Sequence, residues 1–372
     1  MLSLLGLRSA HAQVSSPTPA NAEPAAPPPH QNVITPEIEP ETPWWRYVTA
    51  VPIVLYTPET QFGFGAGLLS TWQLPGAFRD RPSNVIAYGI YTTRKQTVAG
   101  GTAELHFRDD RWVLWQDLRY VDWPDRFYGI GNHTRVSDRQ DYTDHYSQAE
   151  TELLHRVISR LYLGLHHQLR FSDSEQEDRA LRAAGPLGVG SVHWHGLGAV
   201  AAWDTRKGLF WPERGSFLHA DVTRFGARLG SDFSATLLRA DLRHYQPLWR
   251  DHVLAMRLVA SGTLGDVPLQ LMPMLGGPLL FRGWYQGRLR DRVLGALEFE
   301  YRVPLSTRWA LVGFGSVGRV ASRVADFTPR GLHAAGGVGG RFAVVSETRA
   351  NFRLDIAYGD ALYVYLQFKE AF

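Results

Sequence analysis

Hydrophobic and polar residues alternate along much of the chain from Trp44 onward, with the two-residue period of a β-strand. The clearest example is the stretch 349–358, whose polar face consists of Arg349, Asn351, Arg353 and Asp355. Residues 111–119 and 238–243 alternate in the same way. Two all-β architectures fit this pattern. A soluble sandwich would bury its apolar face, whereas a membrane barrel lines its lumen with charges and turns apolar residues toward lipid.

The alternating segments predict an antiparallel barrel of about sixteen strands, an even number as in bacterial outer-membrane barrels. The predicted strands are residues 46–56, 60–74, 82–93, 96–108, 111–121, 142–155, 158–172, 189–204, 215–226, 232–246, 252–264, 292–304, 307–320, 332–345, 349–359 and 362–372. The barrel domain is expected to cover residues 44–372.

The predicted connections fall into two sets. With both chain ends in the periplasm, the short periplasmic turns are 109–110, 156–157 and 305–306. The extracellular side has the tight hairpins 57–59 and 94–95 and the long loops 122–141, 173–188 and 265–291. Short periplasmic turns and longer extracellular loops are typical of outer-membrane barrels.

Composition favours a membrane barrel. Charged residues are 20% of the 372 residues and aromatic residues 12%, with 36 Gly and 12 Trp. These values suit a lipid-facing wall with aromatic girdles, although a soluble sandwich rich in Trp is the alternative. The net charge of +3, without a clustered basic helix, gives no reason to expect nucleic-acid binding.

Two absences narrow the chemistry. The chain has no cysteine, which excludes disulfides, thiolate metal sites and thiol catalysis. It has no run of 18 or more apolar residues, so a transmembrane helix is not expected. A membrane protein without spanning helices has to be a closed barrel, because lipid offers no partner to an open strand edge.

The N-terminal residues are expected to lie outside the barrel. An apolar stretch, 2–7, leads to the small-x-small site Ala10-His-Ala12, which predicts that residues 1–12 are a signal-peptide remnant. An apolar tail is the alternative. Residues 13–43 are rich in Pro, Ala, Ser, Thr and Glu and are predicted to be a disordered linker, too short to contain a folded periplasmic module.

The last predicted strand ends on an aromatic residue. One face of residues 362–372 carries Leu362, Val364, Leu366, Phe368 and Phe372. This pattern resembles the C-terminal signal by which outer-membrane barrels are recognised, and we assign Phe368 and Phe372 to that signal. An ordinary terminal strand is the alternative. Together with the signal-like start of the chain, the pattern favours the membrane barrel over the soluble sandwich.

The histidines do not predict a metal site. His193 and His195 flank Trp194 and share a face, which we expect to line the lumen. A metal would need a third ligand at a recognisable spacing. His166 and His167 point to opposite faces. No Gly-x-Ser-x-Gly elbow, phosphate loop or zinc helix motif is present. We therefore expect no cofactor, no metal and no enzymatic activity.

A long loop followed by a charged strand is the strongest candidate for a functional site. The loop carries Arg282 and Gly283 between two aromatic residues, and the next strand has Glu298, Glu300 and Arg302 on one face. This arrangement predicts a loop that folds back into the barrel and is held there by an Arg–carboxylate pair. The alternative is a tight turn at an exposed tip.

A second motif predicts a defined hairpin. One strand ends in Asp204-Thr-Arg206, and the next begins after a segment with Pro212 and Gly215. Pro212 stops strand pairing and Gly215 permits a positive φ. Further motifs are the spaced Gly337, Gly339 and Arg341, the pair Arg353 and Asp355, and the segments 56–60 and 127–132.

Together with Arg-Gly-Trp and Leu297-Glu298-Phe299, these motifs resemble the BamA/TamA-like bacterial surface antigen family of outer-membrane barrels, in the subgroup that lacks periplasmic POTRA domains. The resemblance implies that Arg282 reaches into the lumen and pairs with Glu298. The acid expected on the next strand is replaced by Ser316, and we expect Glu300 to take over its role.

The resemblance also implies location and function. It places the protein in the outer membrane of a Gram-negative bacterium, with membrane lipid and client outer-membrane proteins as partners. The implied function is insertion or translocation of proteins, or lipids, through a weakly paired seam between the first and last strands. The alternatives are a passive pore for small solutes and an outer-membrane enzyme that acts on lipid.

Overall fold

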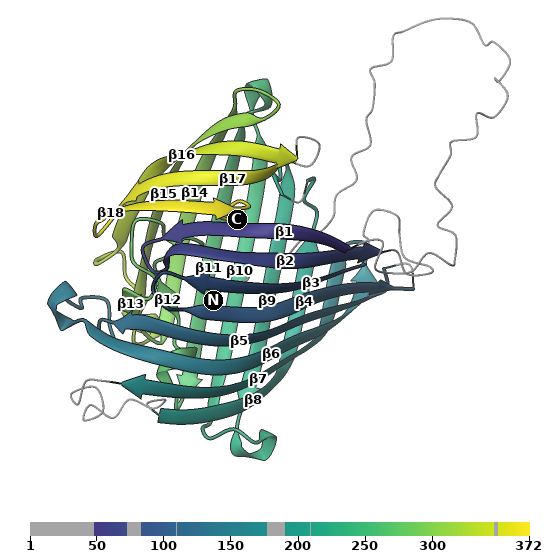
Figure 1. Cartoon of the computed structure of the whole chain (residues 1–372). Coiled ribbons are helices and arrows are strands. Elements are labelled where there is room, and N and C mark those ends of the chain that lie inside the picture. The colour runs from purple at the N-terminus through teal and green to yellow at the C-terminus, as the bar shows by residue number, and fades with distance from the viewer. Residues whose placement is uncertain (1–47, 73–82, 109, 177–189, 209, 346–348) are drawn as a thin grey trace, which may run out of the picture.

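The computed structural model describes residues 48–72, 83–108, 110–176, 190–208, 210–345 and 349–372. In this part of the chain, sixteen antiparallel strands close into one barrel (Figure 1). This confirms the predicted fold class and strand number. The expected signal remnant, 1–12, and linker, 13–43, lie outside the described residues.

The barrel strands follow one another around the wall in chain order. They are β1 (Val48–Thr57), β2 (Gln61–Trp72), β3 (Ser83–Thr92), β4 (Thr97–Phe107), β5 (Trp112–Phe127), β6 (Gln140–Ile158), β7 (Leu161–Gln176), β8 (Gly190–Asp204), β9 (Gly215–Phe225), β10 (Ala235–Pro247), β11 (Val253–Gly265), β14 (Val293–Pro304), β15 (Trp309–Ala321), β16 (His333–Val345), β17 (Ala350–Tyr358) and β18 (Leu362–Phe368).

Three strands, β5, β6 and β7, extend two or more residues beyond their predicted bounds. β5 continues to Phe127 and β6 begins at Gln140, so the loop expected at 122–141 is much shorter. The prediction stopped ahead of Pro124, but β4 pairs with β5 only as far as Asp122. Beyond that point β5 pairs on one side alone, where proline is tolerated. β7 likewise continues to Gln176, past the predicted end at 172.

Side chains alternate between a polar inner face and an apolar outer face. On β5, for example, Leu118 and Tyr120 are exposed on the outside, whereas Asp117 and Arg119 are buried in the lumen. A closed sheet with this polarity is the arrangement that lipid requires. The polar face of the alternating strands therefore lines the lumen and the apolar face points outward, which is the reverse of a soluble sandwich.

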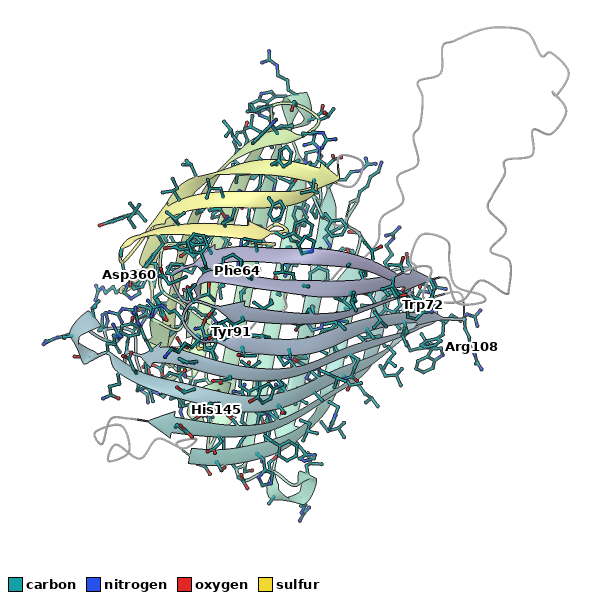
Figure 2. The ribbon with its side chains drawn as sticks, viewed as in Figure 1. Phe64, Trp72, Tyr91, Arg108, His145 and Asp360 are labelled. Atoms are coloured by element: carbon teal, nitrogen blue, oxygen red, sulfur yellow. The ribbon has the colours of Figure 1, made fainter. Side chains whose placement is uncertain are left out.

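The two rims of the barrel differ in their connections. Several turns at one rim are short, as between β14 and β15, whereas the connections 128–139 and 322–332 at the other rim are longer. Figure 2 shows Phe64, Tyr91 and Asp360 toward this second rim, and Trp72 and Arg108 at the first. By the rule for bacterial barrels, the short-turn rim is periplasmic and the other extracellular.

The barrel closes where β18 lies beside β1 (Figure 1), and we call this junction the seam. β1 and β18 are paired at a single ladder position, Tyr56 opposite Leu366. The next ladder, between β17 and β18, already extends over seven positions, from Phe352 to Tyr358. The seam is therefore the weakest backbone junction in the wall.

Candidate functional site

The chain between β11 and β14 folds back into the barrel, as predicted. Within it, β12 (Met274–Leu275) and β13 (Leu289–Arg290) pair as a short antiparallel ribbon. We call residues 276–288, which connect β12 to β13, the inner loop. Apolar residues of this region pack on the inner side of β14 and β15, in a cluster of Leu275, Phe281, Trp284, Leu289, Leu294, Ala296 and Val320.

Arg282 joins the inner loop to the barrel wall. Its side chain is 2% exposed. One terminal nitrogen donates to Asp355 Oδ2 on β17 at 2.7 Å, and the other donates to Glu300 Oε2 on β14 at 2.7 Å. The guanidinium carbon lies 3.6 Å from the ring centroid of Phe314 on β15, which is a cation–π contact. One loop side chain thus contacts three strands.

Both carboxylates also bind arginines of the wall. Glu300 Oε1 accepts a hydrogen bond from Arg302 at 2.8 Å, and Asp355 accepts from Arg341 at 2.6 Å and from Arg353 at 2.9 Å. Burial of such pairs costs desolvation, so their net contribution is small, but removal of one partner costs about 3–5 kcal/mol. We call this set the arginine cluster: Arg282, Glu300, Arg302, Arg341, Arg353, Asp355 and Glu370.

Glu298, the expected partner of Arg282, has a different role. Its Oε1 accepts a hydrogen bond from the main-chain N–H of Phe281 at 2.9 Å. The inner loop runs along the inner face of β14, so Phe281 meets Glu298 and the following residue, Arg282, meets Glu300. The expectation of an Arg282–Glu298 pair was therefore wrong. Ser316 lies opposite Glu298 on β15 and is buried.

Gly283 docks the inner loop on the turn between β17 and β18. Its N–H donates to the hydroxyl of Tyr365 at 3.1 Å, and its carbonyl accepts from the N–H of Asp360 at 3.0 Å. Its φ is +105°, and a Cβ atom here would lie 2.8 Å from the main chain of Tyr358. Only glycine combines this conformation with this close approach.

The inner loop also contacts the opposite side of the seam. The main-chain N–H of Gln286 donates to Glu59 Oε1 at 2.8 Å, in the turn between β1 and β2. Back on the β18 side, Arg288 lies 3.5 Å from the carboxylate of Asp360, in the turn between β17 and β18. The loop therefore bridges the seam from inside, with Gly283 on the β18 side and Gln286 on the β1 side.

Burial determines the protonation of Glu59. The side chain is 2% exposed, and desolvation raises its pKa from 4.5 to about 7, although hydrogen bonds from Thr57 and Gln286 oppose the shift. A buried carboxyl is more stable in its neutral form. The contact between the inner loop and the β1–β2 turn is thus sensitive to pH near neutrality.

The predicted hairpin motif reaches the periplasmic end of the cluster. Arg206 donates to both carboxylate oxygens of Asp204, at 3.0 and 2.9 Å. Gly215 has the predicted positive φ, +100°. The carbonyl of Pro212 accepts a hydrogen bond from Arg302 at 3.2 Å. The turn between β8 and β9 therefore contributes a backbone acceptor to the cluster.

The C-terminal residues depart from the prediction. β18 ends at Phe368, and Lys369, with φ of +77°, turns the chain into the lumen. Glu370 accepts a hydrogen bond from Arg341 at 2.7 Å, and the main-chain oxygen of Phe372 accepts from Arg302 at 2.9 Å. The prediction that Phe372 lies in the strand, on the same face as Phe368, was wrong, because cluster arginines bind the last residues from inside. Phe368 does lie in the strand.

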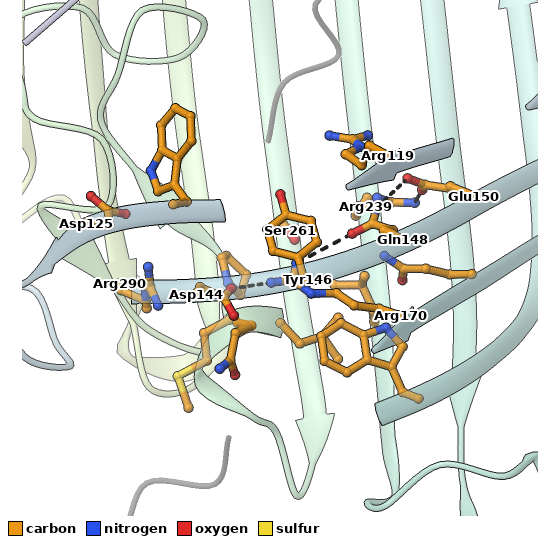
Figure 3. A pocket seen from close by; sticks show the side chains of 18 of the residues that line it. Arg119, Asp125, Asp144, Tyr146, Gln148, Glu150, Arg170, Arg239, Ser261 and Arg290 are labelled. Carbon is orange, nitrogen blue, oxygen red and sulfur yellow. Dashed lines mark hydrogen bonds and ion pairs between the residues drawn. The ribbon is translucent and has the colours of Figure 1, made fainter. Parts of the chain in front are cut away.

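A second polar network lies on the far wall of the lumen, formed by β5–β10. Arg239 donates to Glu150 at 2.7 Å and to Asp221 at 2.8 Å. His166 is fully buried between Glu150 and Glu152. A cavity of about 220 Å³ lies beside this network, and residues 270–273 and Arg290 line it from the loop side (Figure 3).

His193 and His195 point outward, contrary to expectation. Between them, Trp194 is buried in the lumen and packs against Phe233, with ring centroids 5.7 Å apart. Trp194 packs into the apolar cluster beneath the extracellular rim. Because successive side chains of a strand point to opposite faces, both histidines lie outside. Among the described residues, no group of three or more His, Asp or Glu side chains is arranged to hold a metal ion.

Sequence reasoning missed Asp355 as a partner of Arg282. Arg353 and Asp355 were recognised as a motif, but their distance from Arg282 in the chain hid the contact. The glycine at position 339 could have pointed to this site, because a Cβ atom there would lie 2.0 Å from Asp355 Oδ1 and any larger residue would clash. The glycine leaves the space that the ion pair between Asp355 and Arg341 occupies.

The closed sheet, with apolar residues outside and buried ion pairs inside, defines an outer-membrane β-barrel. No described segment forms a helix with the length and hydropathy needed to cross a membrane. The chain belongs to the Omp85 superfamily, because the model of the Omp85 superfamily domain matches residues 81–362. The resemblance seen in the motifs and the outer-membrane location are thereby confirmed.

Solved structures of the same fold agree with this assignment. BamA from Haemophilus ducreyi lacking POTRA domains 1-3 has a TM-score of 0.62 at 12% identity, over 87% of this chain and 70% of that one. CdiB from Acinetobacter baumannii has a TM-score of 0.55 at 12% identity, over 86% of this chain and 59% of that one. CdiB from Escherichia coli has a TM-score of 0.57 at 12% identity, over 86% and 62%.

At this identity the likeness concerns the fold alone. The chain spans less than two thirds of the length of either CdiB chain. Among curated proteins, none matches the sequence significantly.

Proposed function

We propose that this barrel inserts or translocates polypeptides at the outer membrane by opening its seam to a client strand. The observation that carries the proposal is the single ladder position between β1 and β18. Strand edges that lack partners present N–H and C=O groups that a client strand can pair with. Membership of the Omp85 superfamily supports the same function.

The inner loop has two roles in this proposal. It blocks the lumen, which disfavours passive diffusion of solutes. It also positions both sides of the seam through Gly283 and Gln286, so that the barrel keeps its shape while the seam strands separate. Arg282, held by strands β14 and β17, fixes the loop during this movement.

A disulfide across the seam tests the proposal. Tyr56 and Leu366 are directly opposite and both point outward, and opposed residues in a ladder are close enough for a disulfide. The chain has no other cysteine. We expect the oxidised Tyr56→Cys/Leu366→Cys variant in proteoliposomes to stop accelerating the folding of a urea-unfolded eight-stranded barrel, measured by protease protection, and to recover on reduction.

Leu118→Cys/Ala149→Cys is the matched control, since this outward pair lies opposite in the β5–β6 ladder, far from the seam. Its oxidation should leave the acceleration unchanged. Undiminished acceleration by the oxidised seam variant would overturn the proposal. The same conclusion would follow if the reduced protein gave no acceleration over protein-free liposomes.

Conductance separates this proposal from a passive pore. With the inner loop in the lumen, the refolded protein in a planar bilayer should show a closed baseline with rare and variable openings. Large, stable conductance steps would contradict a blocked lumen and would support a pore for small solutes.

A further inference from the structure

An apolar groove runs along the outer surface of β14–β17, separated from the seam by β18. Its volume is about 460 Å³. Several of its side chains are exposed, with Val338 at 64% and Leu311 at 53%. The residues that line it are Val303, Leu311, Val312, Gly313, Val338, Gly339, Gly340, Leu354 and Ile356. The groove thus opens toward the hydrocarbon region of the membrane.

Two glycines on the outer face of β15 and β16 create the groove, because they have no side chains to fill it. Gly313 lies opposite Val338, and Leu311 lies opposite Gly340, so a large and a small residue alternate on the outer face of β15 and β16. A Cβ atom at Gly313 or Gly340 would meet no atom within 4 Å. The hollow therefore faces lipid and is not filled by the barrel itself.

A row of aromatic side chains crosses β15–β18 at the periplasmic end of the groove. Trp309 pairs with Phe342, Phe342 with Phe352, and Phe352 with Phe368. The rings of Trp309 and Phe342 are 4.8 Å apart, and those of Phe352 and Phe368 5.4 Å. Such rows mark the membrane–water interface of a barrel. The groove begins immediately inside the hydrocarbon boundary.

Two arginines lie at the same end, on the aqueous side of this row. Arg308 is exposed in the turn between β14 and β15. Arg349, directly ahead of β17, donates a hydrogen bond to the carbonyl of Ser306 in that turn at 3.4 Å. The guanidinium of Arg349 lies 5.8 Å from the ring centroid of Trp211, which packs on the lumen side of β15. Arg308 is therefore the arginine at the height of lipid headgroups on the outer surface, where arginine binds phosphate by bidentate hydrogen bonds.

We propose that a glycerophospholipid of the periplasmic leaflet binds here, with one acyl chain in the groove and its phosphate at Arg308. The groove is lined almost wholly by aliphatic side chains and glycines, which suits an acyl chain. The inference rests on the outer wall and does not depend on the proposed function.

Filling the groove tests the site without disturbing the fold. Gly313→Leu and Gly340→Leu place a side chain in open space, and Gly89→Leu and Gly262→Leu do the same elsewhere on the outer face, so they are matched controls. Phosphatidylglycerol with 16-carbon chains would be titrated into the detergent-solubilised full chain and its binding measured by native mass spectrometry. We expect one tightly retained lipid, with affinity at least tenfold lower in the groove variants.

The headgroup contact has its own variant. Arg308→Gln should weaken phosphatidylglycerol binding and leave binding of uncharged diacylglycerol unchanged. Equal retention by groove and control variants would overturn the proposal, as would preferential retention of lipid A over phosphatidylglycerol. A dimer that Gly313→Leu abolishes would show that a second copy of the chain occupies the groove, and would also overturn it.

Discussion

Two sides of this barrel are held together by different means. On the far wall, β5, β6, β7 and β8 have 16, 19, 16 and 15 residues and pair along nearly their whole lengths. Beside the seam, β17 and β18 have only 9 and 7 residues, and β18 meets β1 at one position. This side instead contains the arginine cluster and the inner loop.

The difference shows that side-chain contacts can replace backbone pairing where a junction has to open. A long ladder is lost one hydrogen bond at a time, and each N–H and C=O then needs a new partner in lipid. The seam side depends on Arg282, Gly283 and Gln286, which all belong to one loop. That loop keeps both sides of the seam in position, while the far wall is held by its own ladders.

Arg282→Ala should have the largest effect on this contrast. It leaves Glu300 and Asp355 without one of their buried cations, so we expect the free energy of unfolding in detergent to fall by about 3–5 kcal/mol. Urea titration followed by gel mobility would measure this, and the inner loop should become sensitive to protease. Arg239→Ala, on the far wall, should leave the loop protected. Unchanged urea and protease resistance in Arg282→Ala would contradict the role of the arginine cluster.

A rise in pH should weaken the docking of the inner loop at the seam and leave the far wall unchanged. The raised pKa of Glu59, about 7 against 4.5 in an exposed carboxyl, means that docking of the inner loop is strongest below pH 4.5. It declines as the pH rises to about 7 and is constant above that. The total loss is on the order of 3 kcal/mol.

Hydrogen exchange of residues 276–288, corrected for intrinsic rates, would show this decline as falling protection between pH 4.5 and 7. Glu59→Gln should remove the slope, because the amide does not titrate in this range. An identical slope in this variant would assign the pH dependence to another group.

Gly283→Ala should have an intermediate effect. The positive φ and the approach to the main chain of Tyr358 impose a strain of about 1–3 kcal/mol on any other residue. Urea titration should show this loss. Gly89→Ala, where a Cβ atom meets open space on the outer face of β3, should change stability by less than about 0.5 kcal/mol. Equal stability of the two variants would mean that the inner loop shifts without cost.

Arg323→Ala should have the smallest effect. Arg323 pairs with Asp326 at 3.0 Å in an exposed connection between β15 and β16, and water screens such a pair. We expect no measurable change in the urea midpoint. A clear loss would show that exposed ion pairs also hold this side together, which would weaken the contrast with the buried cluster.

The fold could be predicted because alternation is a local property. Strands from β8 onward began within a few residues of their predicted starts, as at Gly190 and Gly215. Alternation shows which residues share a face but not which face points inward, so His193 and His195 were placed wrongly. Their direction follows from Trp194, which packs into the lumen.

The candidate site could be predicted only in part. The motif identified Arg282 and its loop, since the residue types and the glycine are close together in the sequence. Asp355 and the inward turn at Lys369 depend on contacts between distant strands, which one sequence does not reveal. Glu298 and Glu300 share a face, and only the path of the inner loop along β14 decides which of them meets the arginine.

The position of the inner loop also bears on how the barrel is completed during folding. Joining strands from opposite ends of a chain is slow, because the intervening residues lose conformational freedom before the contact forms. In this barrel the turns beside both end strands dock on a segment that lies between them in the sequence, at Gly283 and Gln286. The long chain closure between β1 and β18 is thereby divided into two shorter closures, one from each end strand to the inner loop. The inner loop acts as the template on which the two ends of the sheet are assembled.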